Sequence, residues 1–496
     1  MATLIPPSDV FLVQLFILLT AAIVAGEIAS RFGLVPLIGQ LLVGIVLGPT
    51  LFGSYIGLGT TTLPAELAGI QFLATFFILF MAGLHVDPDE IARMKTKTAA
   101  VGVTIFAVPF AVGAVVVRFV EPTLPSSTDL FVALTLSITA LPVMAIMVSE
   151  FGLTGKRLGN FVMSCALVNE LTAVTVFAIL LQLTLSGHSD YYAVAVAVLS
   201  VGLFLGVVLF VSRLVRYIRE SAWWRAKPDR MAGLWRSREA GFAILMAMAL
   251  GAALYSQLLG LTFLVGAFYG GLLITQAIGG SSGAKGPRTF VSSFSEAGLL
   301  ITQPTPGADR YRAFDSIFTT MSWMFFIPLF FALVGVEMDL RDLGGLVAVG
   351  AFVVLLAMAL ITKLGTGSVL ARGLGMTVTD SLAAGFLLSS RGAVELAMAV
   401  LLLADKVFST GLFTLVALVG LVTTLISPLG AVWAWRSTAA GRAEFEERAP
   451  SLRRGQPLRL TPSIDGPPMP PTDRPLATRR PPNSPPGDGS DPPPSP

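Results

Sequence analysis

Long apolar segments separated by short polar ones fill the chain from residue 8 to residue 434. At a rise of about 1.5 Å per residue, a helix of about 20 apolar residues crosses a hydrocarbon core about 30 Å thick. Hydropathy and turn signals together predict thirteen membrane-spanning helices, at residues 8–28, 36–53, 66–85, 98–118, 127–149, 158–186, 190–212, 239–256, 261–277, 314–336, 345–371, 379–403 and 408–434. The expected fold class is an all-α integral membrane protein.

Basic residues are distributed unevenly between alternate loops, which predicts the orientation because cytoplasmic loops retain Lys and Arg. One set of loops holds nineteen basic residues, eight of them between Arg213 and Arg238. The other set holds three, which are Arg118, Arg341 and Lys406. With thirteen spans, the amino terminus is expected outside and the carboxyl terminus in the cytoplasm of a cell whose plasma membrane holds the protein.

Composition divides the chain into two regions. The whole chain is 54% hydrophobic and only 13% charged, which excludes an ordinary soluble protein. Residues 1–437 are therefore expected to form the transmembrane domain, and residues 438–496 a Pro-rich disordered cytoplasmic tail. A solvated tail is preferred over a site for a proline-recognising partner, and no tail partner is identified. The loop 216–238, rich in Trp and Arg, resembles an interfacial helix on anionic lipid.

Four ionisable residues fall near the middle of predicted spans, where each costs about 2.5 to 3.5 kcal/mol to insert. Glu170 lies in the sixth span, Lys363 in the eleventh, and Arg391 and Glu395 in the twelfth. Arg391 and Glu395 are four residues apart, so they share a helix face and can form an ion pair. All four are candidates for a functional role.

Two spans carry the signature of an interrupted helix. The fifth contains SITALPV, in which Pro142 lacks a backbone donor and Ser137 and Thr139 supply hydroxyls. The twelfth contains a run of small or polar residues, namely Ser389, Ser390, Arg391 and Gly392. These spans are seven apart in order, so spans 1–6 and 8–13 would be related by inversion across the membrane, as in many transporters.

Seven sequence blocks, in this order along residues 20–435, resemble the monovalent cation:proton antiporter-2 family: PLIGQLLVGIVLGPTLFG, FLATFFILFMAGLHVD, LSITALPVMAIMVSEFGLTGKRLG, ALVNELTAV, FFIPLFFALVGVEMDL, TKLGTGSVLARGLGM and SSRGAVELAMAV. That family includes Kef-like and sodium/proton exchangers of bacteria and the plant cation/proton exchangers. The resemblance implies inverted six-helix repeats with two crossed discontinuous helices. It also implies a core domain that moves against a dimerisation domain, and hence a homodimer.

The resemblance also assigns residues. It places the family's ion-binding pair on Asn169 and Glu170, the hydroxyl of the crossing motif on Thr139, the core lysine on Lys363 and the basic residue of the second broken helix on Arg391. Relatives usually end the pair in Asp, whereas this chain has the longer Glu, and the amide at the first position is similar to electroneutral members. The Gly- and Ser-rich stretch 279–313 looks longer than the family's usual loop, and no function is assigned to it.

A buried carboxylate can exchange ions because desolvation favours its protonated form and a nearby cation favours its charged form. The hypothesis is that Glu170 holds either a proton or a partly dehydrated K⁺ or Na⁺, with oxygen ligands from Asn169 and Thr139. Lys363 would balance the charge of the empty site. The ion, the stoichiometry and the electrogenicity stay open.

Other interpretations of these residues also stay open. Glu170 could be a hydrogen-bonded structural acid, although its depth disfavours this. Lys363 could be a structural counterion or a proton carrier, and Arg391 with Glu395 is read as a structural ion pair that holds the broken helix, since an unpaired buried charge is strongly destabilising.

Three rival classes of function are weighed against an antiporter. A cation channel would conduct without proton coupling, and a receptor or scaffold would not explain four midplane charges. An enzyme is disfavoured because the two histidines, His85 and His188, are far apart in sequence. No phosphate-binding G-x-x-x-x-G-K-[ST] motif occurs, so neither nucleotide hydrolysis nor nucleotide gating is visible in the sequence. We expect no cofactor and no nucleic acid partner, only lipid, a second copy of the chain and the transported ions.

Overall fold

The computed structural model describes residues 7–32, 34–84, 96–153, 156–185, 191–220, 238–279 and 320–438, and within these ranges the regular structure is entirely helical. The helices are α1 (Pro7–Arg31), α2 (Pro36–Leu47), α3 (Gly53–Ile56), α4 (Ala65–Leu84), α6 (Thr96–Val120), α7 (Ser126–Thr135), α8 (Leu141–Glu150), α9 (Arg157–Leu185), α10 (Tyr191–Glu220), α13 (Arg238–Leu258), α14 (Phe263–Gly279), the π-turn η1 (Ser322–Phe326), α17 (Ile327–Glu337), the 3-10 turn η2 (Leu340–Leu343), α18 (Leu346–Gly373), α19 (Val378–Leu388), α20 (Ala393–Ala404) and α21 (Thr410–Arg436).

Each of the thirteen predicted spans, over the residues that the structure describes, coincides with one helix or with a pair of half-helices. Within the described ranges, seven segments are long and apolar enough to cross a membrane, and shorter apolar helices such as α2 and α17 account for most of the others. The fifth span is the pair α7 and α8, and the twelfth is α19 and α20. The protein is therefore a multi-pass membrane protein, and the predicted all-α fold class is confirmed.

Three predicted segments are described only in part or not at all. The segment 216–238 was expected to be interfacial, but its first residues continue α10 as far as Glu220, and residues 221–237 lie outside the described residues. Nearly all of the loop 279–313 and of the tail 438–496 lies outside them too.

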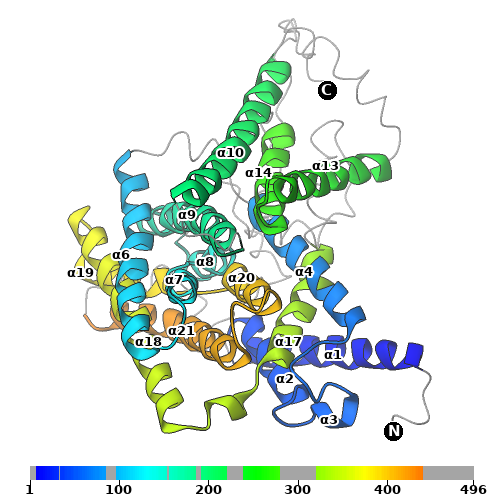
Figure 1. Cartoon of the computed structure of the whole chain (residues 1–496). Coiled ribbons are helices and arrows are strands. Elements are labelled where there is room, and N and C mark those ends of the chain that lie inside the picture. Colours follow the sequence, from blue (N-terminus) through cyan, green and yellow to red (C-terminus); the bar gives the residue numbers. More distant parts are fainter. Residues whose placement is uncertain are drawn as a thin grey trace, which may run out of the picture.

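The helices pack as two bundles, which Figure 1 shows side by side. We call α1, α2, α4, α13, α14 and α17 the flanking bundle. We call α6, α7, α8, α9, α18, α19, α20 and α21 the core bundle. Helix α10 packs against α9 of the core bundle and α14 of the flanking bundle, so it connects the two.

The packing repeats itself between the two halves of the chain. Helix α1 packs on α2 as α13 packs on α14, and α2 packs on α17 as α14 packs on α4. In span order these are the pairs 1 with 2 and 8 with 9, then 2 with 10 and 9 with 3. A shift of seven spans therefore maps the pair 1 with 2 onto 8 with 9, and the pair 2 with 10 onto 9 with 3, as the predicted inverted repeat requires.

Glycines make the equivalent helix contacts in both halves. A Cβ on Gly44 of α2 would lie 2.1 Å from the Ala332 carbonyl oxygen of α17, and Gly335 opposes it from α17. A Cβ on Gly83 of α4 would lie 1.8 Å from the Phe268 carbonyl oxygen of α14. Small residues allow membrane helices to approach this closely, and close packing is what holds such helices together in lipid.

Two glycines of α4 provide a matched test of this contact. Gly83→Ala places a methyl group against backbone, which cannot move aside, so we expect a loss of about 1 to 3 kcal/mol of stability. Gly69→Ala, on the same helix with nothing within 4 Å, should change stability by less than about 1 kcal/mol. Thermal unfolding of the two purified variants in detergent measures the difference. Equal melting temperatures would show that this helix contact is looser than the structure indicates.

A short connecting segment between α17 and α18 links the flanking bundle to the core bundle. Asp339 accepts hydrogen bonds from the Arg341 side chain, with an Nη2 to Oδ2 distance of 2.7 Å, and this pairing lowers the pKa of the Asp339 carboxyl. The Asp339 N–H donates to Thr414 of α21, and the Leu340 N–H donates to Thr50 next to α2. The connecting segment is thus hydrogen-bonded to both bundles.

Candidate ion-binding site

Helix α9 carries Asn169 and Glu170 at its middle. It runs for 29 residues from Arg157 to Leu185, so Glu170 lies about 20 Å from either end at about 1.5 Å per residue. Both side chains are fully buried, with 0% of their surface exposed. The predicted depth of the acid therefore agrees with the structure.

The first break comprises residues 136–140, between α7 and α8, and the Asn169 side chain forms hydrogen bonds with its backbone. The Thr139 N–H donates to Asn169 Oδ1 at 2.8 Å, and Asn169 Nδ2 donates to the Ser137 carbonyl at 3.2 Å. The Ser137 hydroxyl turns back to the Leu134 carbonyl. Pro142 lies in the first turn of α8, where a helix has no use for the N–H that proline lacks, so it marks the restart of the helix.

The second break comprises residues 389–392, between α19 and α20, and it crosses the first. The Ala140 N–H donates to the Ser390 carbonyl at 3.3 Å. A Cβ on Gly392 would lie only 2.7 Å from the Ala140 Cβ, so glycine permits the close crossing. The Ser389 hydroxyl donates to Gly385 of its own helix, whereas the buried Ser390 hydroxyl makes no hydrogen bond. The two predicted discontinuous helices therefore meet backbone to backbone.

Thr139 links the two breaks to Lys363. Its hydroxyl donates to the Leu388 carbonyl at 2.9 Å, at the end of α19, and accepts from Lys363 Nζ at 2.5 Å. Lys363 projects from α18 and is fully buried. The lysine is thus joined to the first break through one hydroxyl, rather than through an ion pair.

Arg391 fastens the second break to the first. Its Nη1 donates to the Thr135 carbonyl at 2.7 Å, and its Nη2 donates to the Leu136 carbonyl. These carbonyls end α7, where a positive charge is favourable because of the helix dipole. The predicted ion pair is present as well, with Nη1 3.3 Å from Glu395 Oε1. Most of the guanidinium's bonds therefore go to the broken backbone.

The Glu170 carboxyl stands apart from these networks. Neither of its oxygens accepts a hydrogen bond, although the backbone N–H of Leu141 at the start of α8 approaches it. Within the described part of the chain it takes part in no ion pair. A buried carboxylate without partners is costly, so this group is suited to hold a proton or to bind a cation from outside.

Several functional candidates escaped the sequence analysis. Thr424 of α21 accepts from the Arg391 N–H at 3.1 Å and donates to the Arg391 carbonyl, and so braces the second break as Asn169 braces the first. In the flanking bundle, Gln71 Nε2 donates to the buried Glu337 at 2.6 Å. The motif GVEMD could have drawn attention to Glu337, but no signal pointed to Thr424. The two histidines considered in the sequence analysis, His85 and His188, lie outside the described residues.

Two crossed broken helices around a buried acid define a membrane transporter of the inverted-repeat type. Residues 16–436 match the model of the sodium/hydrogen exchanger transmembrane family, and the chain belongs to that family. The predicted resemblance to monovalent cation:proton antiporters is thereby confirmed. The family consists of transporters rather than enzymes.

Relatives and solved structures agree with this assignment. The chain is 28% identical over 439 residues to the Na(+)/H(+) antiporter NhaS4 of Synechocystis sp., covering 84% of this chain and 95% of the relative. It is 25% identical over 409 residues to K(+)/H(+) antiporter 1 of Saccharomyces cerevisiae, covering 79% of this chain but 42% of that longer protein. It therefore spans less than half the length of the yeast relative.

The fold also matches a solved structure, that of the sodium proton antiporter MjNhaP1 from Methanocaldococcus jannaschii. The TM-score is 0.58 at 15% identity, and the match covers 85% of this chain and 96% of that one. At this identity the likeness concerns the fold alone, and it confirms the predicted antiporter fold with its inverted repeats.

Proposed function

We propose that this chain is a secondary transporter that exchanges a monovalent cation, K⁺ or Na⁺, for protons by alternating access. The observation that carries the proposal is the Glu170 carboxyl, fully buried, without a hydrogen-bond partner and next to the first break. Such a group is stable only when a proton or a cation neutralises it. Because both compete for one carboxyl, release of one on either side permits uptake of the other.

Glu170, Asn169 and Thr139 are the proposed cation ligands. Asn169 Oδ1 accepts one hydrogen bond, from the Thr139 N–H, and a carbonyl oxygen has a second lone pair that can bind a cation. Amide, hydroxyl and carboxylate oxygens are the donors that hard alkali cations prefer. The ligands would thus come from α9 and from the first break, so the site would respond to any movement of that break against α9.

Lys363, Arg391 and Glu395 are proposed as the charges that stabilise the crossing. Lys363 Nζ donates to the Thr139 hydroxyl and so occupies one of the two lone pairs of that oxygen. The other lone pair remains for the cation. Ser137, Ser389 and Ser390 lie in the breaks and Gly392 permits their contact. Pro142 fixes where α8 begins.

The two bundles suggest how alternating access would occur. The core bundle carries Glu170, and we propose that it moves against the flanking bundle, which forms the contact between two copies of the chain. Exposed apolar side chains of α1, including Phe16 at 70% exposure, are available to lipid or to a second copy. We also propose a plasma-membrane location. The loop charges support an amino terminus outside, and the tail 438–496 would then be cytoplasmic.

Flux measurements on the reconstituted chain test the proposal. Liposomes containing the chain and a pH-sensitive dye should show proton movement when K⁺, Na⁺, Rb⁺ or Li⁺ is added outside, and an imposed pH gradient should drive uptake of the preferred ion. A channel would pass the cation equally well without a pH gradient. Cation flux that is indifferent to the gradient, or no flux for any of the four ions, would rule the exchange out.

A further inference from the structure

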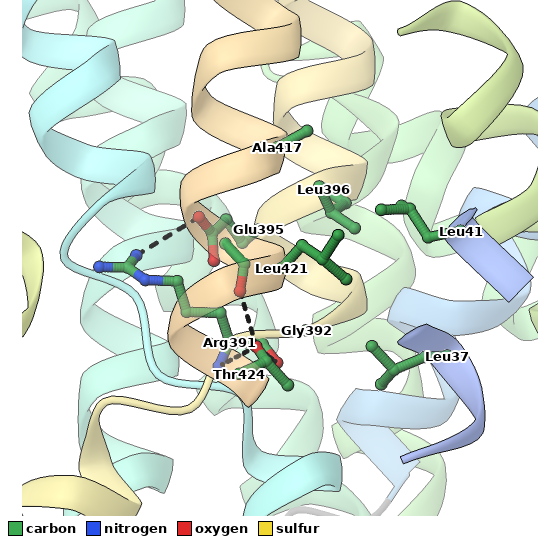
Figure 2. Close-up of a pocket in the computed structure, with 10 residues that line it drawn as sticks. Leu37, Leu41, Arg391, Gly392, Glu395, Leu396, Ala417, Leu421 and Thr424 are labelled. Carbon is green, nitrogen blue, oxygen red and sulfur yellow. Dashed lines mark hydrogen bonds and ion pairs between the residues drawn. The ribbon is translucent and has the colours of Figure 1, made fainter. Parts of the chain in front are cut away.

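A narrow pocket lies where the core bundle faces the flanking bundle (Figure 2). Leu37 and Leu41 of α2 form one wall, and α20 and α21 form the other. The polar residues among those that line it are Arg391, Glu395 and Thr424. The space is on the order of one water molecule, so it can admit a very small ligand only.

Glu395 presents an unsatisfied oxygen at this pocket. The side chain is 1% exposed, and its Oε2 makes no hydrogen bond, while Oε1 faces Arg391. Gly420 of α21 leaves room beside the carboxyl, because a Cβ there would lie 3.3 Å from Oε1. A buried carboxylate oxygen without a partner requires a proton, a water molecule or a cation.

Arg391 does not depend on Glu395 for its hydrogen bonds. In Figure 2 the arginine side chain points away from Leu37 and Leu41, and its two terminal nitrogens donate to the Thr135 and Leu136 carbonyls. Glu395 can therefore become neutral while the two terminal nitrogens of the guanidinium keep their carbonyl acceptors. The ion pair is one of several bonds in this cluster rather than its only support.

The surroundings favour a proton over a metal ion. The basic groups that act on Glu395 are Arg391 in the second break and Lys363 on α18. Helices α2 and α21 contribute no charged residue to the pocket lining. A metal cation would find few oxygen ligands on these largely aliphatic walls, whereas a proton needs only the carboxyl oxygen itself.

We propose that Glu395 is a second proton-binding carboxyl, separate from the cation site at Glu170, and that its occupancy sets how exchange depends on pH. The proposal rests on the exchange function proposed above. The mechanism follows from the location of Glu395 beside Leu37 and Leu41. If the core bundle moves against α2, burying a neutral Glu395 next to these leucines costs less free energy than burying a charged one. Protonation would then shift the population of the two access states.

Exchange kinetics of Glu395→Gln in liposomes test the proposal. The amide keeps an oxygen for Arg391 but cannot titrate, so exchange should continue with a flattened pH profile. The ratio of rates at about pH 6 and about pH 9 should change by about threefold or more. The cation concentration that gives half the maximal rate should change less than this ratio. Glu66→Gln, an exposed acid of α4, is the matched control and should leave both quantities as they are.

Infrared difference spectra of the purified protein test proton binding without transport. A pH step should change a protonated-carboxyl band that is absent in Glu395→Gln and present in Glu170→Gln, and saturating K⁺ or Na⁺ should not remove it. Failure of the exchange proposal alone would leave this band intact. Should Glu395→Gln be unstable, Glu395→Asp should keep the band at a shifted midpoint. Wild-type spectra and a wild-type pH profile in Glu395→Gln would overturn the proposal.

Discussion

Replacing Glu170 by glutamine should abolish cation-driven proton flux while the protein remains folded in the membrane. The amide has nearly the same shape, and the carboxyl it replaces accepts no hydrogen bond, so packing is preserved. The glutamine amide can neither release a proton nor balance the charge of a cation. The rate of cation-driven proton flux should therefore fall at least about 100-fold. Dequenching of a pH dye in everted vesicles measures the flux, and size-exclusion chromatography of the solubilised variant checks folding.

The conservative variant Glu170→Asp provides the matched comparison. It keeps the charge but withdraws it by one methylene group. We expect exchange to persist, with altered affinities for Na⁺ and K⁺ because the carboxylate moves relative to Asn169 and Thr139. If Glu170→Gln exchanged cations as well as the unaltered protein does, the carboxyl of residue 170 would not be the shared site, and the mechanism would have to be placed elsewhere.

The spans and the depth of Glu170 could be predicted because lipid imposes a simple rule on sequence. Every segment that crosses the membrane must be apolar for about 20 residues, so a single acid within such a segment is conspicuous. Breaks in the helices were also visible, since Pro142 and the small residues around Arg391 are unusual there. These signals are local in sequence and need no knowledge of the packing.

The hydrogen bonds that connect the breaks could not be predicted. Thr424 lies 33 residues from Arg391 and Gln71 lies 266 residues from Glu337. Thr and Gln are tolerated in membrane helices for many reasons, so neither one indicates its partner. The predicted partner of Arg391 was Glu395, one helical turn away, whereas its shorter bonds reach across to the carbonyls that end α7. Such contacts exist only after the chain has folded.

The internal repeat was visible in span order but not as sequence identity. The structure shows where it resides: Gly39 and Gly44 of α2 correspond to Gly266 and Gly271 of α14, with the same spacing of five residues. In each pair the first glycine meets the preceding span and the second meets its partner from the other half. The close approach of backbones limits residue size at these four positions in both halves, whereas the remaining apolar side chains can differ between the halves.

Replacing Arg391 by methionine should be the most destabilising single change in the core bundle. Methionine has a similar length and packs in the same space, but the Thr135 and Leu136 carbonyls lose their donor and Glu395 loses its counter-charge. Removing one partner of a buried ion pair costs about 3 to 5 kcal/mol. Thermal unfolding in detergent, followed by the fraction that stays monodisperse, measures the effect.

The double variant Arg391→Met with Glu395→Gln separates the two contributions. It removes the unpaired buried charge but still leaves the carbonyls without a donor, so it should recover only part of the lost stability. Arg391→Lys keeps the charge with a smaller set of donors and should fall between the single variant and the original protein. Full recovery in the double variant would mean that the arginine serves Glu395 alone. The bonds across the crossing would then contribute nothing measurable, contrary to the role assigned to Arg391 in joining the breaks.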